Sequence, residues 1–148
     1  MSKLDLTALF NKLERTNDRL ERLAQYKMLK LEDYLASEDT QIIVERLLEL
    51  VIQSVLDINR NILKQSAHIS NEVSNFDSFL EMGKAGYVPI ELAEKIAPSG
   101  SFRNVLAHEY DNIVAEKVFV GLQFALQQYP DYIEALQIYL VLLDSSIQ

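Results

Sequence analysis

Residues 40–69 read TQIIVERLLELVIQSVLDINRNILKQSAHI, a run rich in aliphatic residues that contains neither glycine nor proline. At 3.6 residues per turn, its apolar side chains fall on nearly every side of a helix instead of along a single stripe. A helix with that distribution is buried on several sides, either at the centre of a bundle or between a core and a second subunit. We therefore expect the central helix of an all-α protein, which also forms part of a dimer interface.

Several polar side chains lie on this otherwise apolar helix, namely Glu45, Arg46, Gln53 and Asp57. Buried polar groups need hydrogen-bond or ionic partners, so the simplest interpretation is a set of structural pairs. The alternative is that these side chains orient the residues of a functional site. His68, at the end of the helix, is expected only to interact favourably with the helix C-terminus.

The preceding segment has leucines at three- and four-residue spacing, which predicts one long amphipathic helix over residues 4–35. Residues 37–40 interrupt that pattern and offer capping side chains for the start of the next helix. Basic residues occupy the other face of the first helix, where we expect solvation, with contact to an RNA backbone as the alternative. These residues are Lys12, Arg15, Arg19, Arg22, Lys27 and Lys30.

Shorter helices are expected after residue 71. Aromatic and aliphatic residues at 76–82 predict a helix that stops at Gly83 or Gly86. Pro89 is placed to begin a further short helix over residues 90–97, because proline is favoured at the first helical position.

The last part of the chain predicts two more helices, residues 113–128 and residues 131–143. Pro130 separates them, because a proline removes a backbone donor and should break or kink a continuous helix. No repeat or linker divides the chain. Residues 1–148 are therefore expected to form a single domain, an all-α bundle of four to five main helices.

Polar chemistry is concentrated in residues 101–110, SFRNVLAHEY. The preceding Pro-Ser-Gly, residues 98–100, is expected to be a turn, after which Ser99 or Ser101 caps a new helix. Arg103 would then lie in or near a first helical turn, where free N–H groups and the helix dipole favour an anion.

Three side chains of this stretch are candidates for catalysis or binding. Histidine, here His108, transfers protons near neutral pH, and arginine, here Arg103, stays charged and offers a fork of donors to phosphate oxygens. Asn104 shares a helical face with His108 and is placed to orient the imidazole or to contact a substrate. Arg103 and His108 lie roughly 140° apart around a helix, so one helix does not aim both at one point. From spacing alone, a structural hydrogen-bond set is the competing interpretation.

Cleavage of RNA without a metal needs a base for the 2′-hydroxyl, an acid for the leaving 5′-oxygen and a cation for the phosphorane. One copy of the stretch supplies one histidine and one arginine. Two copies facing each other across a two-fold axis supply two of each, so we expect a homodimer with a shared site.

The residues of this stretch also carry a family resemblance. The R-x4-H-x-Y motif is matched by Arg103, His108 and Tyr110, with four residues between the first two and one between the last two. The sequence FRNVLAHEY resembles the corresponding block of HepT toxins in the HEPN superfamily. The upstream helix resembles that family's long second helix, and the resemblance extends over about residues 10–140. The matching upstream residues are Asp39, Val44, Glu45, Arg46, Gln53 and Asp57.

The resemblance implies an all-helical homodimer that is a metal-independent ribonuclease toxin acting on RNA, with Arg103 and His108 as the catalytic residues. It also implies an antitoxin of the minimal nucleotidyltransferase (MNT) type, which adenylylates Tyr110. The added AMP would block an RNA phosphate near His108 by its bulk and negative charge. We expect Asn104 and Lys84 to bind or orient substrate, and we expect neither a metal nor a cofactor.

The composition of the 148-residue chain bears on its location and partners. The chain has a formal net charge of −8, 49% hydrophobic residues and no cysteine. The lack of cysteine suits a reducing cytoplasm, and no apolar run predicts a membrane span or a signal peptide. The negative charge counts against a nucleic-acid binder. Two alternatives to the nuclease therefore stay open, a non-catalytic helical partner and a nucleotide-binding accessory subunit of an MNT nucleotidyltransferase.

Overall fold

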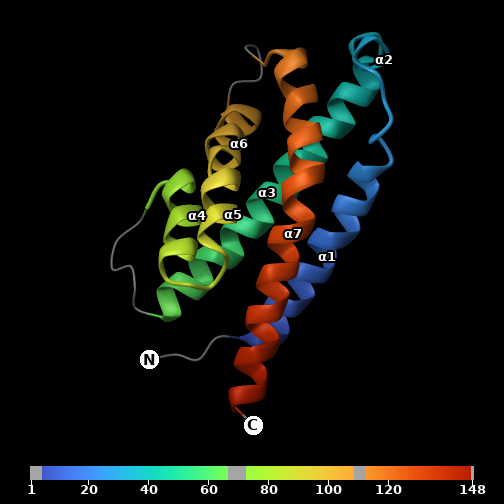
Figure 1. Ribbon diagram of the computed structural model, residues 1–148. Helices are drawn as coiled ribbons and strands as arrows, with labels where there is room; N and C mark the ends of the chain where they lie inside the picture. Colours follow the sequence, from blue (N-terminus) through green and yellow to red (C-terminus); the bar gives the residue numbers. More distant parts are fainter. Residues whose placement is uncertain (1–4, 67–72, 109–112, 148) are drawn as a thin grey trace.

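The computed structural model describes residues 5–66, 73–108 and 113–147, and within these ranges the protein is an all-α bundle without strands (Figure 1). The expected fold class is therefore confirmed. The helices are α1 (Leu6–Ala24), α2 (Leu31–Leu35), α3 (Glu38–Gln65), α4 (Asn75–Lys84), α5 (Ile90–Ile96), α6 (Pro98–His108) and α7 (Ala115–Ile147). None of the helices in the described ranges is both long and apolar enough to cross a bilayer.

The central element is α3, as its apolar pattern predicts. It crosses the molecule diagonally and packs against α1, α2, α4, α6 and α7 (Figure 1). Most of its aliphatic residues are fully buried, and each such side chain contributes about 1.5–3 kcal/mol when it leaves water. Among its described residues, the exposed large hydrophobic side chains are Ile42 and Ile43, at its N-terminal end. Most of the apolar surface of α3 thus faces the core of its own chain.

The prediction of one long helix over residues 4–35 is wrong. Helix α1 ends at Ala24, and the chain bends before the single turn of α2 begins. The bend turns Tyr26 and Leu29 against the core and leads to Tyr34, whose ring is fully buried beside that of Phe119. Burial of these side chains outweighs the helical preference of the segment. The expected cap of α3 is present, because Ser37 Oγ accepts from the backbone N–H of Thr40.

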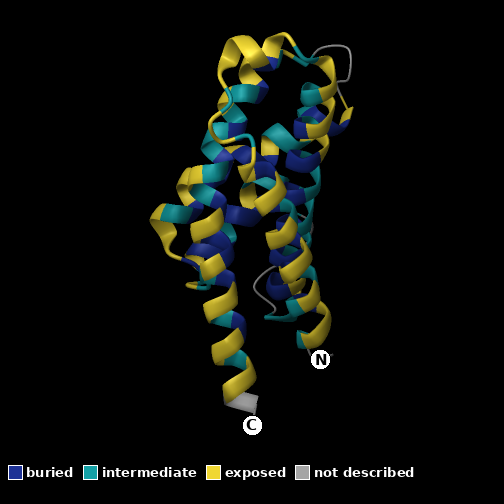
Figure 2. Cartoon of the chain, turned by 90° about the vertical axis from the view of Figure 1, so that its right-hand side faces the viewer, coloured by how far each residue is buried: buried dark blue, intermediate teal, exposed yellow. Residues whose placement is uncertain are grey.

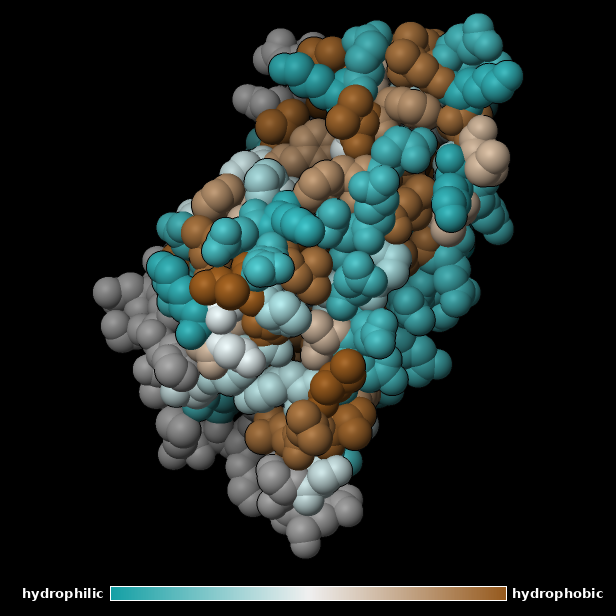
Figure 3. All heavy atoms as spheres, in the orientation of Figure 1, coloured by the Kyte–Doolittle hydropathy of each residue, from teal (hydrophilic) through white to brown (hydrophobic). Residues whose placement is uncertain are grey.

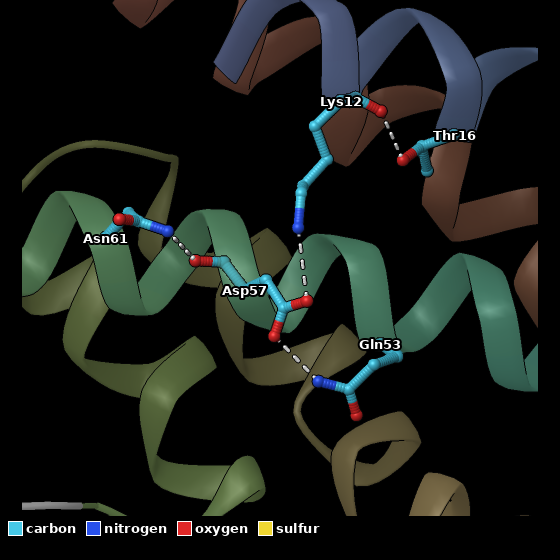
Figure 4. Close-up of polar contacts among 5 residues, drawn as sticks. All are labelled: Lys12, Thr16, Gln53, Asp57 and Asn61. Atoms are coloured by element: carbon cyan, nitrogen blue, oxygen red, sulfur yellow. Dashed lines mark hydrogen bonds and ion pairs between the residues drawn. The ribbon is translucent and has the colours of Figure 1, made fainter. Parts of the chain in front are cut away.

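Polar contacts join α1 to α3 on one side of the bundle (Figure 4). The Nζ atom of Lys12 lies 3.3 Å from Asp57 Oδ2, and Gln53 Nε2 donates to Asp57 Oδ1 at 2.7 Å. Both ion-pair partners are about one third exposed, so the pair contributes at most about 1 kcal/mol. Asp57 and Gln53 therefore have partners on α1 and α3. Arg46 pairs with Glu49 of its own helix at 3.1 Å.

The C-terminal half of the chain departs from expectation at Pro130. The structure has one helix, α7, which passes through this exposed proline without a break, although a helix-interior proline costs about 3 kcal/mol. Two buried tyrosines flank the proline and bond to other helices. Tyr129 Oη lies 2.7 Å from Ser99 Oγ, and Tyr132 Oη donates to Asn59 Oδ1 at 2.7 Å. Tertiary packing therefore holds the helix together through a residue that would break it in isolation.

The segment between α3 and α6 follows the expected pattern more closely. Helix α4 ends at Lys84, and the chain turns at Gly86, whose φ of 82° is easily reached only by glycine. Pro89 then precedes the first residue of α5. Together α4, α5 and α6 form a group beside α3 and α7 (Figure 1). Buried residues line the inward sides of the helices, whereas exposed ones predominate in the last turns of α7 (Figure 2).

Candidate active site

Helix α6 carries residues 101–108 of the polar stretch, and it begins earlier than predicted. Residues 98–100 are its first turn and not a loop, with Pro98 at a position where proline is well tolerated. Ser99 is not a cap, because its hydroxyl lies 2.6 Å from the carbonyl oxygen of Ile96 and 2.7 Å from Tyr129 Oη. Arg103 therefore lies in the second turn. The expected turn at residues 98–100 is wrong, and the free N–H groups at the start of the helix lie one turn before Arg103.

Two glycines let α6 approach its neighbours closely. A Cβ atom on Gly100 would lie 2.7 Å from the backbone carbonyl of Asn75, and one on Gly121 would lie 2.7 Å from the Phe102 ring. The backbone of α6 is thus in contact with the first turn of α4, and its Phe102 ring rests on the backbone of α7. These contacts fix the position of α6 and of the polar residues that it carries.

A chain of hydrogen bonds joins three helices beside the motif. Arg60 Nη2 on α3 donates to Asn75 Oδ1 at 2.7 Å and to the carbonyl oxygen of Val73 at 3.1 Å. Asn75 Nδ2, on the first residue of α4, donates in turn to Asn104 Oδ1 of α6 at 2.9 Å. Sequence reasoning missed Arg60 and Asn75, because no spacing along the chain relates residues 60, 75 and 104. The only available signal was a basic residue on the apolar central helix.

Arg103 and His108 occupy different sides of α6. Arg103 is half-buried, and its Nε atom is buried without a hydrogen-bond partner among the described residues. His108 is exposed and ends the helix. The two residues are roughly 140° apart around the axis, as predicted. A positively charged fork with an unmet donor is suited to an anion, and the histidine is open to solvent.

Asn104 lies on the exposed face that also carries His108, one helical turn away. Its amide oxygen is bonded to Asn75, and no contact among the described residues would let it orient the imidazole. Lys84 lies at the opposite end of α4 from Asn75, about 14 Å along the axis, and it pairs with Glu81 at 3.5 Å. The structure therefore does not bring Lys84 beside Arg103.

Some expectations concern neighbouring parts of the chain. Tyr110 and His68 lie outside the described residues. In the part of the chain that the structure describes, no cluster of acidic, histidine or cysteine side chains is arranged to hold a metal ion. Over the same ranges of one copy of the chain, α1 packs on α3 and α7 and does not contact α6.

Comparisons with known proteins agree with the fold and with the family resemblance. A sequence model of the HepT-like family, described as "Ribonuclease HepT-like", matches residues 16–136. The chain is 40% identical over 144 residues to a protein named "tRNA nuclease HepT" from Aphanizomenon flos-aquae (strain 2012/KM1/D3), and the alignment covers 97% of each chain.

A solved structure has the same fold. The cytosolic protein of unknown function YutE from Bacillus subtilis superposes with a TM-score of 0.74 over 95% of this chain and 93% of its own, at 17% identity. The family match spans α3 and α6, and the relative is aligned over almost the entire length. The chain therefore belongs to the HepT-like ribonuclease family of the HEPN superfamily.

Proposed function

We propose that this protein is the toxin of a toxin–antitoxin pair and a metal-independent endoribonuclease whose substrate is tRNA. The observation that carries this proposal is the arrangement on α6, where a half-buried arginine with an unmet donor precedes an exposed histidine by five residues. The name of the 40% identical relative, a tRNA nuclease, supports tRNA as the substrate class.

In the proposed reaction, the imidazole of His108 takes the proton of the RNA 2′-hydroxyl. The 2′-oxygen attacks the adjacent phosphorus, and the bond from phosphorus to the 5′-oxygen breaks. Arg103 stabilises the charge on the phosphorane oxygens, and a protonated histidine returns a proton to the leaving 5′-oxygen. The products are a 2′,3′-cyclic phosphate and a free 5′-hydroxyl, so atoms and protons balance without a metal.

The acid and the base of this scheme come from two copies of the chain. Each copy has one histidine in the motif, and Arg103 and His108 of one helix point to different sides. A homodimer with α6 of each subunit near the two-fold axis supplies two of each residue. This arrangement also accounts for a single exposed histidine in a reaction that needs both an acid and a base.

The experiment is cleavage of a tRNA pool in EDTA by protein produced without its partner, whose unmodified state is checked by intact mass. We expect wild type to cleave, and Arg103→Ala and His108→Ala each to lose about 100-fold or more of the rate. Ser101→Ala, an exposed change on the same helix, is the matched control and should keep full activity. Lys84→Ala tests whether that lysine takes part, and its position predicts little effect.

Unchanged cleavage by both Ala variants would exclude the proposed site. Absence of cleavage of any RNA by the unmodified wild type would replace the nuclease with the non-catalytic partner of a nucleotidyltransferase. A rate that depends on added Mg²⁺ would remove metal independence from the proposal.

We further propose that an MNT-type antitoxin neutralises the toxin by adenylylating Tyr110. The tyrosine follows His108 by two residues, and an attached AMP adds bulk and negative charge where an RNA phosphate would bind. Tyr110→Phe should keep nuclease activity and remain toxic when the antitoxin is co-expressed, whereas wild type gains the mass of one AMP and loses activity. Silencing of Tyr110→Phe by the antitoxin would show that another event neutralises the toxin.

A further inference from the structure

The hydrogen bonds from α3 to α6 have a fixed direction. An arginine side chain carries donors and no acceptor, so the atom of Asn75 that faces Arg60 is its amide oxygen, at 2.7 Å. The Asn75 NH₂ group must then face Asn104, and the atom of Asn104 that receives it, at 2.9 Å, is the amide oxygen. The remaining group of Asn104 is its NH₂, which can only donate. The guanidinium of Arg60 thus sets the orientation of an amide two residues away in the network.

The network is held at both ends. Arg60 Nη2 also donates to the carbonyl oxygen of Val73, which fixes the guanidinium next to the start of α4. The backbone of Asn75 touches that of Gly100, so the first turn of α4 and the motif helix cannot separate without loss of packing. Asparagine amides are often ambiguous in orientation, but a partner that only donates removes the ambiguity here.

The orientation of the Asn104 amide matters because its NH₂ group, which does not bond to Asn75, lies on the same side of α6 as His108. Asn104 is exposed on the same side of α6 as His108, about 6 Å away along the axis. The non-bridging oxygens of an RNA phosphodiester are anionic and accept hydrogen bonds. An amide NH₂ at this place attracts such an oxygen, whereas a reversed amide would present a carbonyl oxygen and repel it.

We propose that Arg60 and Asn75 are positioning residues, which hold the Asn104 amide so that its NH₂ donates to the RNA backbone beside His108. The proposal rests on the RNA substrate proposed above and adds the two residues that set the orientation of the Asn104 amide. Arg60 and Asn75 act through Asn104, and Asn104 is the residue that touches the RNA.

The test is Asn75→Asp. This substitution keeps the hydrogen bond from Arg60 and reverses the direction of the hydrogen bond with Asn104. A carboxylate accepts from Arg60 and also from Asn104, so Asn104 must turn its NH₂ inward and its oxygen outward. Stability should not fall, because the new bond to Arg60 is charge-assisted and an acidic residue in the first turn of α4 is favoured. We expect affinity for an uncleavable 2′-O-methyl RNA, followed by fluorescence anisotropy, to fall about tenfold.

The matched control is Ser74→Asp. Ser74 is exposed, precedes Asn75 directly and caps α4 by accepting from the Asp77 N–H at 3.0 Å, a role that aspartate fills equally well. This variant adds the same negative charge at the neighbouring position and leaves the amide network intact. It should bind RNA within about twofold of wild type, which separates the reversal of the amide from simple charge repulsion.

A second variant covers the case in which Asn75→Asp unfolds. Asn104→Asp still accepts from Asn75 but presents a carboxylate oxygen outward, and it should lose at least as much affinity. Equal binding by wild type and Asn75→Asp, or equal losses in Asn75→Asp and Ser74→Asp, would overturn the proposal. These readings are distinct from the nuclease test, because RNA binding is measured without cleavage. If wild type binds RNA but does not cleave it, the proposed orientation of the Asn104 amide still holds, and the proposed catalytic role of Arg103 and His108 is wrong.

Discussion

Tyr129 and Tyr132 lie on the same buried side of α7, and their hydroxyls bond to different helices. Burial raises the pKa of both phenols, so both hydroxyls stay protonated. Tyr132 Oη is the partner of Asn59 Oδ1, and the Nδ2 atom of this buried amide has no partner among the described residues. Ser99, which contacts Tyr129, has a second bond to Ile96. Removal of the Tyr132 hydroxyl would therefore leave the Asn59 side chain without a partner in the described ranges, whereas removal of the Tyr129 hydroxyl would leave Ser99 with one.

We predict that Tyr132→Phe lowers the free energy of unfolding by about 1–3 kcal/mol, because it leaves a fully buried amide without any partner. Tyr129→Phe should cost less, about 0.5–1 kcal/mol, because Ser99 keeps its bond to the carbonyl oxygen of Ile96. Urea denaturation of both variants gives the comparison. Equal losses would mean that the bond of Ser99 to Ile96 does not compensate.

A pH-dependent prediction concerns Glu45 on α3. Burial raises the pKa of this carboxyl group, and its charge in turn raises the pKa of the buried Tyr34 hydroxyl after the larger effect of burial. A raised pKa means that the folded state binds the proton more tightly. The favourable contribution of Glu45 is therefore fully present below its ordinary pKa of about 4.3 and is lost as pH rises through the raised value.

Glu45→Gln should therefore melt at a higher temperature than wild type at neutral pH, and this advantage should shrink towards about pH 4. The measurement is the melting temperature of both proteins across that range. Glu49→Gln, one turn further along α3, is the control, because it removes a carboxylate that is paired with Arg46 and should not stabilise the protein. An advantage that is constant with pH would exclude ionisation as its cause.

At this scale the sequence pointed to the motif residues as candidates but not to the residues that hydrogen-bond to them. Arg103, Asn104 and His108 share one short stretch, so their proximity follows from chain connectivity. Arg60 and Asn75 reach the site only through the packing of α3, α4 and α6. Such a contact depends on the relative placement of helices, which no periodicity within a single helix contains.

At the scale of the helix, the position of α6 depends on the close approach at Gly100. We predict that Gly100→Ala lowers stability by about 1–3 kcal/mol and reduces RNA cleavage, because the new methyl group would press on the Asn75 backbone and push α6 away from α4. Thermal melting and the cleavage rate are measured on the same preparation.

Gly86→Ala is the control for this variant. A methyl group on Gly86 would have no described atom within 4 Å, but the φ of 82° at this position strains any other residue. The change should therefore cost about 1 kcal/mol of stability and leave the cleavage rate unchanged. A Gly100→Ala protein with lower stability and full activity would show that α6 can move without harm to the site.

The helix boundaries show where local signals are sufficient. The Ser37 cap and the glycine turn after α4 were predictable because both depend on neighbouring residues. The bend after Ala24, the helical state of residues 98–100 and the continuity of α7 through Pro130 were not. In each case buried side chains on distant helices outweigh a local preference of a few kcal/mol.

At the scale of the whole molecule, the exposed apolar residues bear on self-association. The sequence pointed to α3 as part of a dimer interface, but α3 exposes only Ile42 and Ile43 among its described large hydrophobic residues. Helix α7 exposes more of them, and Figure 3 shows hydrophobic side chains gathered over its C-terminal part. Those of α7 are Val120, Ile138, Val141 and Leu142.

We predict that the protein sediments as a dimer and that Val141→Asp, on the apolar surface near the end of α7, shifts it towards monomer. Ile42→Asp is the matched change on α3 and should leave the dimer intact. Dissociation by Ile42→Asp alone would return the interface to α3. A wild-type protein that sediments as a monomer at all concentrations, yet cleaves RNA, would contradict the shared site.

The antiparallel packing of α1 and α7 has a practical consequence. Helix α1 begins, and α7 ends, at one end of the bundle, whereas α6 runs towards the other end (Figure 1 and Figure 2). A short linker could therefore join the last turn of α7 to the first turn of α1 without passing over the motif helix. The bundle is thus suited to circular permutation, to fusion of two copies in one polypeptide, and to tethering on a surface with His108 turned away from the support.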